Sequence, residues 1–456
     1  MNFKFQISNF KSVLIAGLFL SVVTVAQTPV PAPTKSTLAP NGAIEGTTEF
    51  ITSNGLKVIH RLVTGNEVVA ARIYFKGGSR NVTEKNAGIE TLMWEVAQLG
   101  TKNFSKSQIN REKDRLGTGI SAGSTYDFSV VGSICIRKHF DRTWNLLTDV
   151  TLNPVFDERE VALEKDKLIS LLRQENDNPE TQVESLSDRL LYTAHPYSNR
   201  PFGTIENISK LTAADLKAYH ATQLTTSRML VVVVGNVALE ELKRKVEASF
   251  GKLPRGEYKP GPAPGFKNIE KPEFQVIDKA VPTNYIHGTF PAPSIGDPDY
   301  PALMVIKEIL QGLFKIEVRD KRNLSYAPGI DLSSQATNSG SISVSTPKPN
   351  EAIKVMFEQI ELLQRVFVRE EYLSSIIVGF LTTYYRNLET NASQAARLAE
   401  YELLAGDWRK SGTWLSDVAK VKPEDLNRVA NKYLRNFRFA VVGQARDFDR
   451  ALFLSK

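Results

Sequence analysis

The sequence is poor in the side chains that bind metals or form cross-links. Its 456 residues include a single cysteine, Cys135, which forms neither an internal disulfide nor a cluster of thiolate ligands for zinc. The five histidines are His60, His139, His195, His220 and His287. No two of them lie within five positions of each other, so none forms the helical pair, four residues apart, that commonly binds zinc. We therefore expect each histidine to have a structural role in the core or at the surface.

The sequence also lacks a strong excess of charge. It has 57 Lys and Arg against 50 Asp and Glu, a net charge of +7 at pH 7, without a block of basic residues. We therefore predict no nucleic-acid partner. Apolar residues make up 42% and charged residues 23% of the chain, a composition that excludes wholesale disorder, collagen and coiled coil and is typical of a globular protein.

Long hydrophobic runs are missing as well. The longest one, at 13–26, has 14 residues and follows Lys4 and Lys11, whereas a membrane-spanning helix needs about 20 residues. Small residues at 24–26 fit a cleavage site, so we predict a signal peptide at 1–26 and no stable membrane span after its removal. The protein is then expected to be secreted or periplasmic in a bacterial envelope; an uncleaved N-terminal anchor is the alternative.

The rest of the chain divides into two similar halves. A Pro-rich tether is predicted at 27–46 and a Pro- and Gly-rich linker at 254–269, which leaves domains at 47–253 and 270–456. Both domains end with an amphipathic helix, beginning near Asp215 or Asp425, and a short apolar strand that ends in glycine. This pattern predicts an internal duplication. The predicted fold class is α+β, with two homologous domains that each carry a mostly antiparallel sheet and helices on one face.

Several local elements can be assigned from their patterns. Residues 56–62 and 68–75 alternate as strands and predict a hairpin, and 84–99 predicts a helix with one apolar face. Asp157 is expected to cap the helix that follows it. Glu90 and Glu95 are separated by about 140° around a helix, so they cannot readily chelate one ion, and we expect both to be solvated or salt-bridged.

One catalytic motif is matched by its letters only. Residues 119–123 read Gly-Ile-Ser-Ala-Gly, which fits a nucleophile elbow, but that motif needs a helix after the serine. The residues that follow, 125–136, are rich in strand formers and alternate. We therefore interpret the match as a chance occurrence within a sheet. Phosphate-binding and dinucleotide-binding loops are both missing from the sequence.

A series of short motifs, in a specific order and spacing, carries a family resemblance. They are Phe75–Arg80, Ala87–Ile89, Gly100–Thr101, Asp177–Pro179, His195–Tyr197, Arg200–Thr204, Thr212–Leu216 and Val318–Tyr326. With them the chain resembles the insulinase/pitrilysin-type peptidases, which include the mitochondrial processing peptidase, over roughly residues 47–450. The resemblance implies two α/β sandwich domains that enclose a peptide-binding cavity together with those of a partner.

The resemblance also implies that the metal site of this family is degenerate here. Active members carry His-x-x-Glu-His between the Gly-Ile and Gly-Thr landmarks, and these positions hold Thr91, Trp94 and Glu95. The third ligand, a glutamate on a later helix, would fall around 170–172, which reads Ser-Leu-Leu. Zinc hydrolysis needs three protein ligands and a general base. We therefore expect no bound metal, no cofactor and no catalytic residue in this chain.

What remains is the substrate-binding half of a divided site. In two-chain members of the family, as the resemblance implies, the chain without zinc supplies an Arg and a Tyr that hold the substrate backbone, and Arg322 and Tyr326 match that pair. A guanidinium and a phenol can both donate to a peptide carbonyl. The glycine-rich turn before this segment is shortened to 311–314. Ser121, Ala122 and Gly123 match the edge strand to which an extended peptide adds by main-chain hydrogen bonds.

The resulting hypothesis is a secreted, non-catalytic, substrate-binding subunit of an insulinase-type peptidase complex. Its expected partners are a zinc-bearing subunit of the same family and an extended peptide, and peptidase activity is expected only with that subunit. Two alternatives stay open: a peptide-binding chaperone or assembly scaffold without a peptidase role, and a zinc peptidase whose ligands have moved elsewhere.

Overall fold

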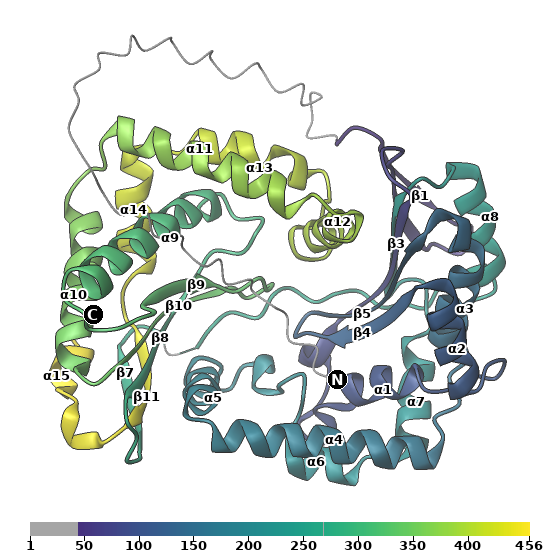
Figure 1. Ribbon diagram of the computed structural model, residues 1–456, viewed down its shortest axis with the longest axis horizontal. Helices are drawn as coiled ribbons and strands as arrows, with labels where there is room; N and C mark the ends of the chain where they lie inside the picture. Colours follow the sequence, from purple (N-terminus) through teal and green to yellow (C-terminus); the bar gives the residue numbers. More distant parts are fainter. Residues whose placement is uncertain (1–43, 268) are drawn as a thin grey trace, which may run out of the picture. The chain divides into compact units, whose positions relative to one another are not determined.

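The computed structural model describes residues 44–267 and 269–456, which form two mixed sheets flanked by helices (Figure 1). The predicted signal peptide and nearly all of the tether lie outside the described residues. In the part of the chain that is described, no helix is long and apolar enough to cross a membrane.

The first sheet has six strands in the order β1-β2-β6-β3-β5-β4. Its strands are β1 (Thr47–Ile51), β2 (Lys57–Leu62), β3 (Val68–Lys76), β4 (Gly119–Ser124), β5 (Phe128–Ile136) and β6 (Met229–Gly235). The pair β2–β6 is parallel and every other pair is antiparallel. The predicted hairpin between the strands at 56–62 and 68–75 is wrong, because β6 lies between β2 and β3 and pairs with both.

The second sheet repeats this topology with five strands in the order β7-β11-β8-β10-β9. Its strands are β7 (Glu273–Asp278), β8 (Asn284–Pro291), β9 (Gly329–Leu332), β10 (Ser339–Thr346) and β11 (Arg438–Gly443). Here β7–β11 is the parallel pair, as β2–β6 is in the first sheet. In each sheet the last strand of the half is inserted between two consecutive strands, β6 between β2 and β3 and β11 between β7 and β8. The predicted fold class is confirmed in its mixed α+β character and its two repeated sheets. The domain boundaries at 47–253 and 270–456 stay a prediction, although the strands of each sheet fall within them.

Fifteen α-helices surround the sheets among the described residues. They are α1 (Ile89–Ala97), α2 (Lys106–Leu116), α3 (Phe140–Leu152), α4 (Glu158–Asp177), α5 (Pro179–Leu191), α6 (Ile205–Lys210), α7 (Ala213–Gln223), α8 (Leu239–Phe250), α9 (Tyr300–Phe314), α10 (Pro349–Arg365), α11 (Glu370–Asn387), α12 (Asn391–Ala405), α13 (Lys410–Ala419), α14 (Pro423–Tyr433) and α15 (Arg450–Phe453). The Asp157 side chain caps α4 as expected, by accepting hydrogen bonds from two backbone N–H groups. Asp215 and Asp425 lie in the first turns of α7 and α14, which confirms both helix starts.

The helix expected at 84–99 is shorter than predicted. A single 3-10 turn occupies Glu84–Asn86, and α1 begins only at Ile89. The break lies at Gly88, whose φ of +93° places it in the left-handed region, and a β-carbon there would approach the Ile208 side chain to 2.5 Å. Glycine is therefore required at the entry to α1 both by conformation and by space.

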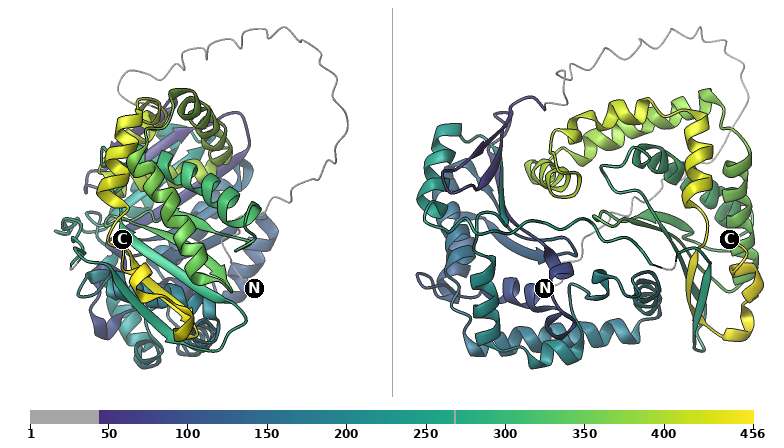
Figure 2. Two further views of the ribbon diagram at one scale, coloured as in Figure 1. Left: turned by 90° about the vertical axis from the view of Figure 1, so that its left-hand side faces the viewer. Right: turned by 180° about the vertical axis from the view of Figure 1, so that it is seen from behind.

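Each sheet is covered on its second face by a helix of the other half. In the first sheet, one face packs on α1, α3, α7 and α8 in the large core, and the opposite face packs on α12 through Ala395, Leu398 and Ala399. In the second sheet, α5 packs on β8 and β11. Figures 1 and 2 both show the yellow-green α12 beside the purple strands. The prediction of helices on one face therefore holds within each half. The other face of each sheet is covered by a helix from the other half, α12 or α5, which we call the exchanged helix.

A buried carboxylate connects the two halves at the turn between β4 and β5. Asp127 accepts hydrogen bonds from Tyr197 Oη at 2.7 and 2.8 Å and from the backbone N–H of Ala336 at 2.9 Å, and it forms an ion pair with Arg80 at 3.2 Å. The Thr337 N–H in turn donates to Tyr197 Oη over 3.2 Å. The loop between β9 and β10 is thus held against the first half by this carboxylate together with the hydrogen bond that Tyr192 Oη donates to Gln335 at 2.8 Å.

Candidate functional site

The three positions of the family's metal motif lie on α1 but point into different surroundings. Thr91 is buried and donates its hydroxyl hydrogen bond to the Pro201 carbonyl at 2.6 Å. Trp94 is 1% exposed and its ring lies 4.6 Å from that of Phe75. Its indole N–H has no hydrogen-bond partner in the described chain. Only Glu95 is exposed.

The helix that would supply a third ligand packs beside α1, without a carboxylate at the expected place. The α1 and α4 helices are in contact, but around 170–172 α4 offers Ser170, whose hydroxyl donates to the Asp166 carbonyl, an exposed Leu171 and a buried Leu172. Partial burial raises the pKa of the Glu95 carboxyl, with a further rise from Glu164 and an opposing effect of Lys167. One threonine, one buried indole and one carboxylate do not fit a zinc site. Among residues 44–267 and 269–456, no group of three or more His, Cys, Asp or Glu side chains is arranged to hold a metal ion.

The other glutamate on α1, Glu90, does not have the surroundings that were predicted for it. Glu90 is buried and is neither solvated nor salt-bridged. It accepts hydrogen bonds from three hydroxyl groups: Ser129 Oγ at 2.5 Å, Ser124 Oγ at 3.2 Å and Tyr219 Oη at 2.7 Å. These donors satisfy the carboxylate and attach α1 to the β4–β5 hairpin. The donors lie 34 to 129 residues away in sequence, so local sequence carries no signal for this cluster.

The predicted peptide-binding residues lie in the last strand of the first sheet. Ser121, Ala122 and Gly123 belong to β4, which pairs with β5 on one side and has no strand on the other among the described residues. Ser121 is exposed, while Ala122 packs toward the large core over α1. A free edge leaves alternate backbone N–H and C=O groups available for another strand. The strand has no helix after it, so the nucleophile-elbow interpretation stays excluded.

The predicted Arg and Tyr lie together on the second half. A π-helical turn, Lys315–Asp320, continues α9, so residues 311–314 form the end of a helix and not a turn. Val318 and Leu324 are buried and anchor the segment. Arg322 Nη1 donates to the Glu317 carboxylate at 2.5 Å and to its carbonyl at 2.8 Å.

Tyr326, four residues after Arg322, extends into solvent. It is 83% exposed, and the Arg319 guanidinium lies 5.0 Å from the centre of its ring. In the described chain its hydroxyl has no hydrogen-bond partner. Together with Ser345 and Pro347 the segment lines an open hollow. No hydrogen bond, ion pair or ring contact within the described residues joins Arg322 or Tyr326 to α1 or β4, so the two candidate regions are separate features of one chain.

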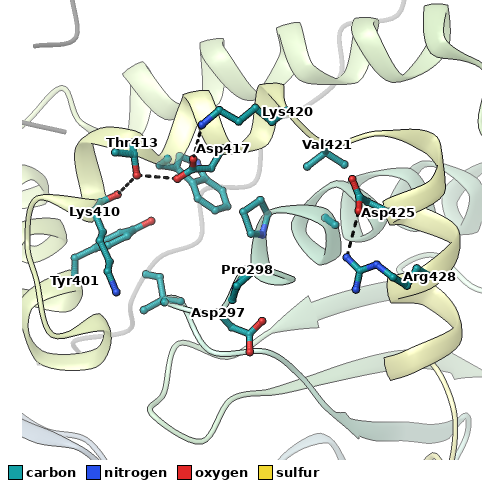
Figure 3. Close-up of a pocket in the computed structure, with 15 residues that line it drawn as sticks. Asp297, Pro298, Tyr401, Lys410, Thr413, Asp417, Lys420, Val421, Asp425 and Arg428 are labelled. Atoms are coloured by element: carbon teal, nitrogen blue, oxygen red, sulfur yellow. Dashed lines mark hydrogen bonds and ion pairs between the residues drawn. The ribbon is translucent and has the colours of Figure 1, made fainter. Parts of the chain in front are cut away.

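A pocket between α9, α12, α13 and α14 is the alternative place for a ligand (Figure 3). Four of its six charged side chains are paired with one another. Asp417 accepts from Thr413 at 2.7 Å and pairs with Lys420 at 3.3 Å, and Asp425 pairs with Arg428 at 3.3 Å. The other two, Lys410 and Asp297, form hydrogen bonds only with backbone groups in the described chain, and sequence reasoning found no signal in this pocket.

Three of the histidines have the structural roles that were expected. The imidazoles of His60 and His220 are buried and lie 2.8 and 2.9 Å from the carbonyls of Val237 and Thr151. His195 accepts a hydrogen bond from the Tyr197 N–H at 3.1 Å. Burial lowers the pKa of each of these imidazoles, and a nearby carbonyl or carboxylate partly opposes it.

Comparison with known proteins identifies the family. The model described as insulinase (peptidase family M16) matches residues 57–204, and the model described as peptidase M16 inactive domain matches residues 210–377. The chain belongs to the insulinase/pitrilysin family. The match with the second model begins just before α7 and includes Arg322 and Tyr326.

Relatives of this M16 chain extend over nearly its whole folded length. An uncharacterized zinc protease of Mycobacterium bovis is 25% identical over 405 residues, which cover 85% of this chain and 91% of the relative. A crystal structure of a peptidase M16 inactive domain from Pseudomonas fluorescens matches with a TM-score of 0.81 at 18% identity, over 88% of this chain and 98% of that one. The periplasmic protease PqqL of Escherichia coli matches with a TM-score of 0.74 at 15% identity, over 95% of this chain and 49% of that one. The two structures show the likeness of fold.

Proposed function

We propose that this chain is the non-catalytic, substrate-binding subunit of an exported M16 peptidase complex. Its family membership makes it a peptidase-like protein. The residues of α1 and α4 support a role in binding substrate rather than in binding zinc. A threonine hydroxyl, an indole and an exposed carboxylate replace the ligands and the general base, so that place lacks a set of zinc ligands and has an indole at the position of the base.

The exposed Tyr326 is the observation that carries the proposal. An aromatic ring that is 83% exposed gains no stabilisation from burial within the isolated chain, and its hydroxyl is accessible to a ligand. Four residues earlier, Arg322 uses only Nη1 for its contacts with Glu317, so the N–H groups on Nε and Nη2 remain available. One phenol O–H and these guanidinium donors form a set that can hold a peptide carbonyl and stabilise negative charge developing on its oxygen.

The partner is proposed to be a zinc-bearing chain of the same family. This chain matches about half of the periplasmic protease PqqL, a polypeptide long enough to hold two such units. A two-subunit complex would provide two such units as separate chains. We also propose export to the bacterial envelope, which the apolar run at 13–26 and this periplasmic neighbour support.

The test is turnover of a peptide by the complex purified with its native partner. Replacing Tyr326 with Phe removes one donor and keeps the ring; the expected result is a fall in kcat of about tenfold or more, since one lost oxyanion donor costs roughly 10²–10³ in rate. Tyr385→Phe is the matched control, because Tyr385 is also an exposed tyrosine but lies on α11, and its loss should leave kcat unchanged.

Three results would contradict the proposal. An unchanged kcat for Tyr326→Phe in an active complex would remove Tyr326 from the site. A stable solitary homodimer without peptidase activity in any complex would instead favour the scaffold alternative. One tightly bound zinc per chain in metal analysis of the isolated protein would favour the alternative with relocated ligands.

A further inference from the structure

The inner face of the first sheet, opposite the large core, carries three parallel rows of side chains that lead inward from the free edge of β4. The rows follow from the pairing register. The first is Gly119–Ile134–Ala70, the second Ser121–Gly132–Arg72 and the third Gly123–Val130–Tyr74. In each row, the residue on β4 has no side chain or a small one.

These rows are open toward the edge. The exchanged helix α12 packs on β3 and β6, and on β5 the side chain of Ile134 is 46% exposed. A β-carbon added at Gly119 or at Gly123 would meet nothing within 4 Å. Packing within the described chain therefore does not require glycine at either position, and the space above β4 is free for side chains from another strand.

The central row ends in an arginine that leans toward this space. Gly132 lies between Arg72 and Ser121, and a β-carbon on it would meet Arg72 Cγ at 3.2 Å. The arginine side chain therefore lies over the glycine. Arg72 interacts with the Tyr74 phenol and forms no ion pair with a carboxylate in the described chain. Glu400, on α12 near Tyr74, is bonded to the Ser334 hydroxyl.

We propose that Arg72 gives this edge a preference for a peptide with an acidic side chain between two apolar ones, spaced two residues apart. The proposal rests on the proposed function, because it takes the β4 edge as the place where the extended substrate adds. Successive side chains of a strand alternate between faces, so positions i, i+2 and i+4 of an added strand would face the three rows. The outer two meet Ile134 on one side and Val130 on the other, and the middle one faces Arg72.

The geometry allows this contact. Strands are spaced about 4.8 Å apart, so the added strand lies about 14 Å from the Arg72 backbone. Two side chains span this distance from opposite ends. The glutamate side chain of the peptide extends across β4 above Ser121, and the Arg72 side chain extends across Gly132 on β5. A charge-assisted hydrogen bond between them is stronger than one with a neutral amide, which makes the charge at the middle position decisive.

Binding of capped peptides to the full chain, without the partner subunit, tests the inference. The probes are fluorescein-labelled peptides with a blocked C-terminus and the core Val-Thr-Glu-Thr-Val, or the same core with Gln or Lys in the middle, measured by fluorescence anisotropy. The Glu peptide is expected to bind about tenfold more tightly than the Gln peptide. In Arg72→Gln this difference should vanish, and in Arg72→Glu the Lys peptide should become the preferred one.

A matched control and a second variant keep the test decisive. Lys76→Gln removes a positive charge from the same strand and the same face, opposite Phe128 beyond the end of β4, and should keep the preference for Glu. Gly123→Phe should fold, since its β-carbon has free space, and should weaken all three peptides by covering the third row. Equal affinities of the Glu and Gln peptides, or no binding of any peptide, would overturn this inference. The Tyr326→Phe assay tests the proposed function separately, because it measures turnover by the complex and not peptide binding by the isolated chain.

Discussion

Removing the Asp127 carboxylate should loosen the contact between the two halves of the chain. This side chain is nearly buried and accepts from Tyr197 Oη, from the Ala336 N–H and from Arg80. Asp127→Ala leaves all three donors without their acceptor. Two of them belong to the first half and one to the loop before β10, so the substitution acts on the junction and not on either core.

The magnitude follows from these contacts. A hydrogen bond to a charged group contributes about 1.5–3 kcal/mol, and breaking a buried ionic cluster by removing one partner costs about 3–5 kcal/mol in total. We expect a loss near 3–5 kcal/mol in the free energy of unfolding. For a chain of this size that corresponds to a fall in Tm of roughly 3–10 °C.

Hydrogen exchange provides the more specific measurement. The amide N–H of Ala336 donates to Asp127, and that of Thr337 donates to Tyr197 Oη, so both amides depend on the cluster. In Asp127→Ala we expect faster exchange at these two positions, while amides of the central strand β6 keep their protection. Local opening of this kind is measured independently of global unfolding.

The reasoning would be refuted by unchanged exchange at Ala336 and Thr337 together with a Tm within about 1 °C of the original protein. Asp141→Asn is the matched control. Asp141 is an exposed carboxylate that forms one ion pair, with Lys245 at 2.5 Å. Exposed ion pairs contribute about 0–1 kcal/mol, so this variant should change neither Tm nor exchange.

Two further predictions concern pH, and both are measured as the Tm difference between variant and original protein. Burial alone would raise the pKa of Glu49, but hydrogen bonds from Trp408, Arg409 and Lys57 lower it to about 2. Its stabilisation is therefore present above the unfolded value of 4.5 and is lost as pH falls toward 2, so Glu49→Gln should cost roughly 2 kcal/mol at pH 7 and almost nothing near pH 2. An equal Tm difference at both pH values would contradict this. Burial raises the pKa of Asp188 from 3.8 to about 6, with Arg200 opposing it; its ionised form is disfavoured in the folded state above that pH, so Asp188→Asn should raise Tm at pH 8 and leave it unchanged at pH 3. A destabilised Asp188→Asn at pH 8 would show that the charge is needed.

The candidate site was predictable to the extent that its residues are adjacent in sequence. Arg322 and Tyr326 lie on one short segment anchored by Val318 and Leu324, so their proximity follows from chain connectivity. The positions of Thr91, Trp94 and Glu95 follow from counting between two glycine landmarks. Their surroundings do not: that Trp94 is enclosed in the core beside Phe75 depends on β3, a separate element.

The sequence by itself determined the elements that depend on local periodicity and local hydrogen bonds. The helix caps at Asp157, the starts of α7 and α14 and the two glycine-ended strands all arise from contacts within a few residues. The repeat of these elements after 210 residues was enough to predict two similar halves, because the same local pattern folds in the same way in both.

The tertiary structure alone decided which distant segments meet. Strand β6 pairs between β2 and β3, although those two strands are consecutive, and Glu90 takes its three hydroxyl donors from elements as far as 129 residues away. The row from Ser121 through Gly132 to Arg72 exists only because two pairing registers coincide on one face. Alternation along a strand sets which side chains share a face, but the register between strands depends on the burial of the whole sheet, and only the folded chain fixes it.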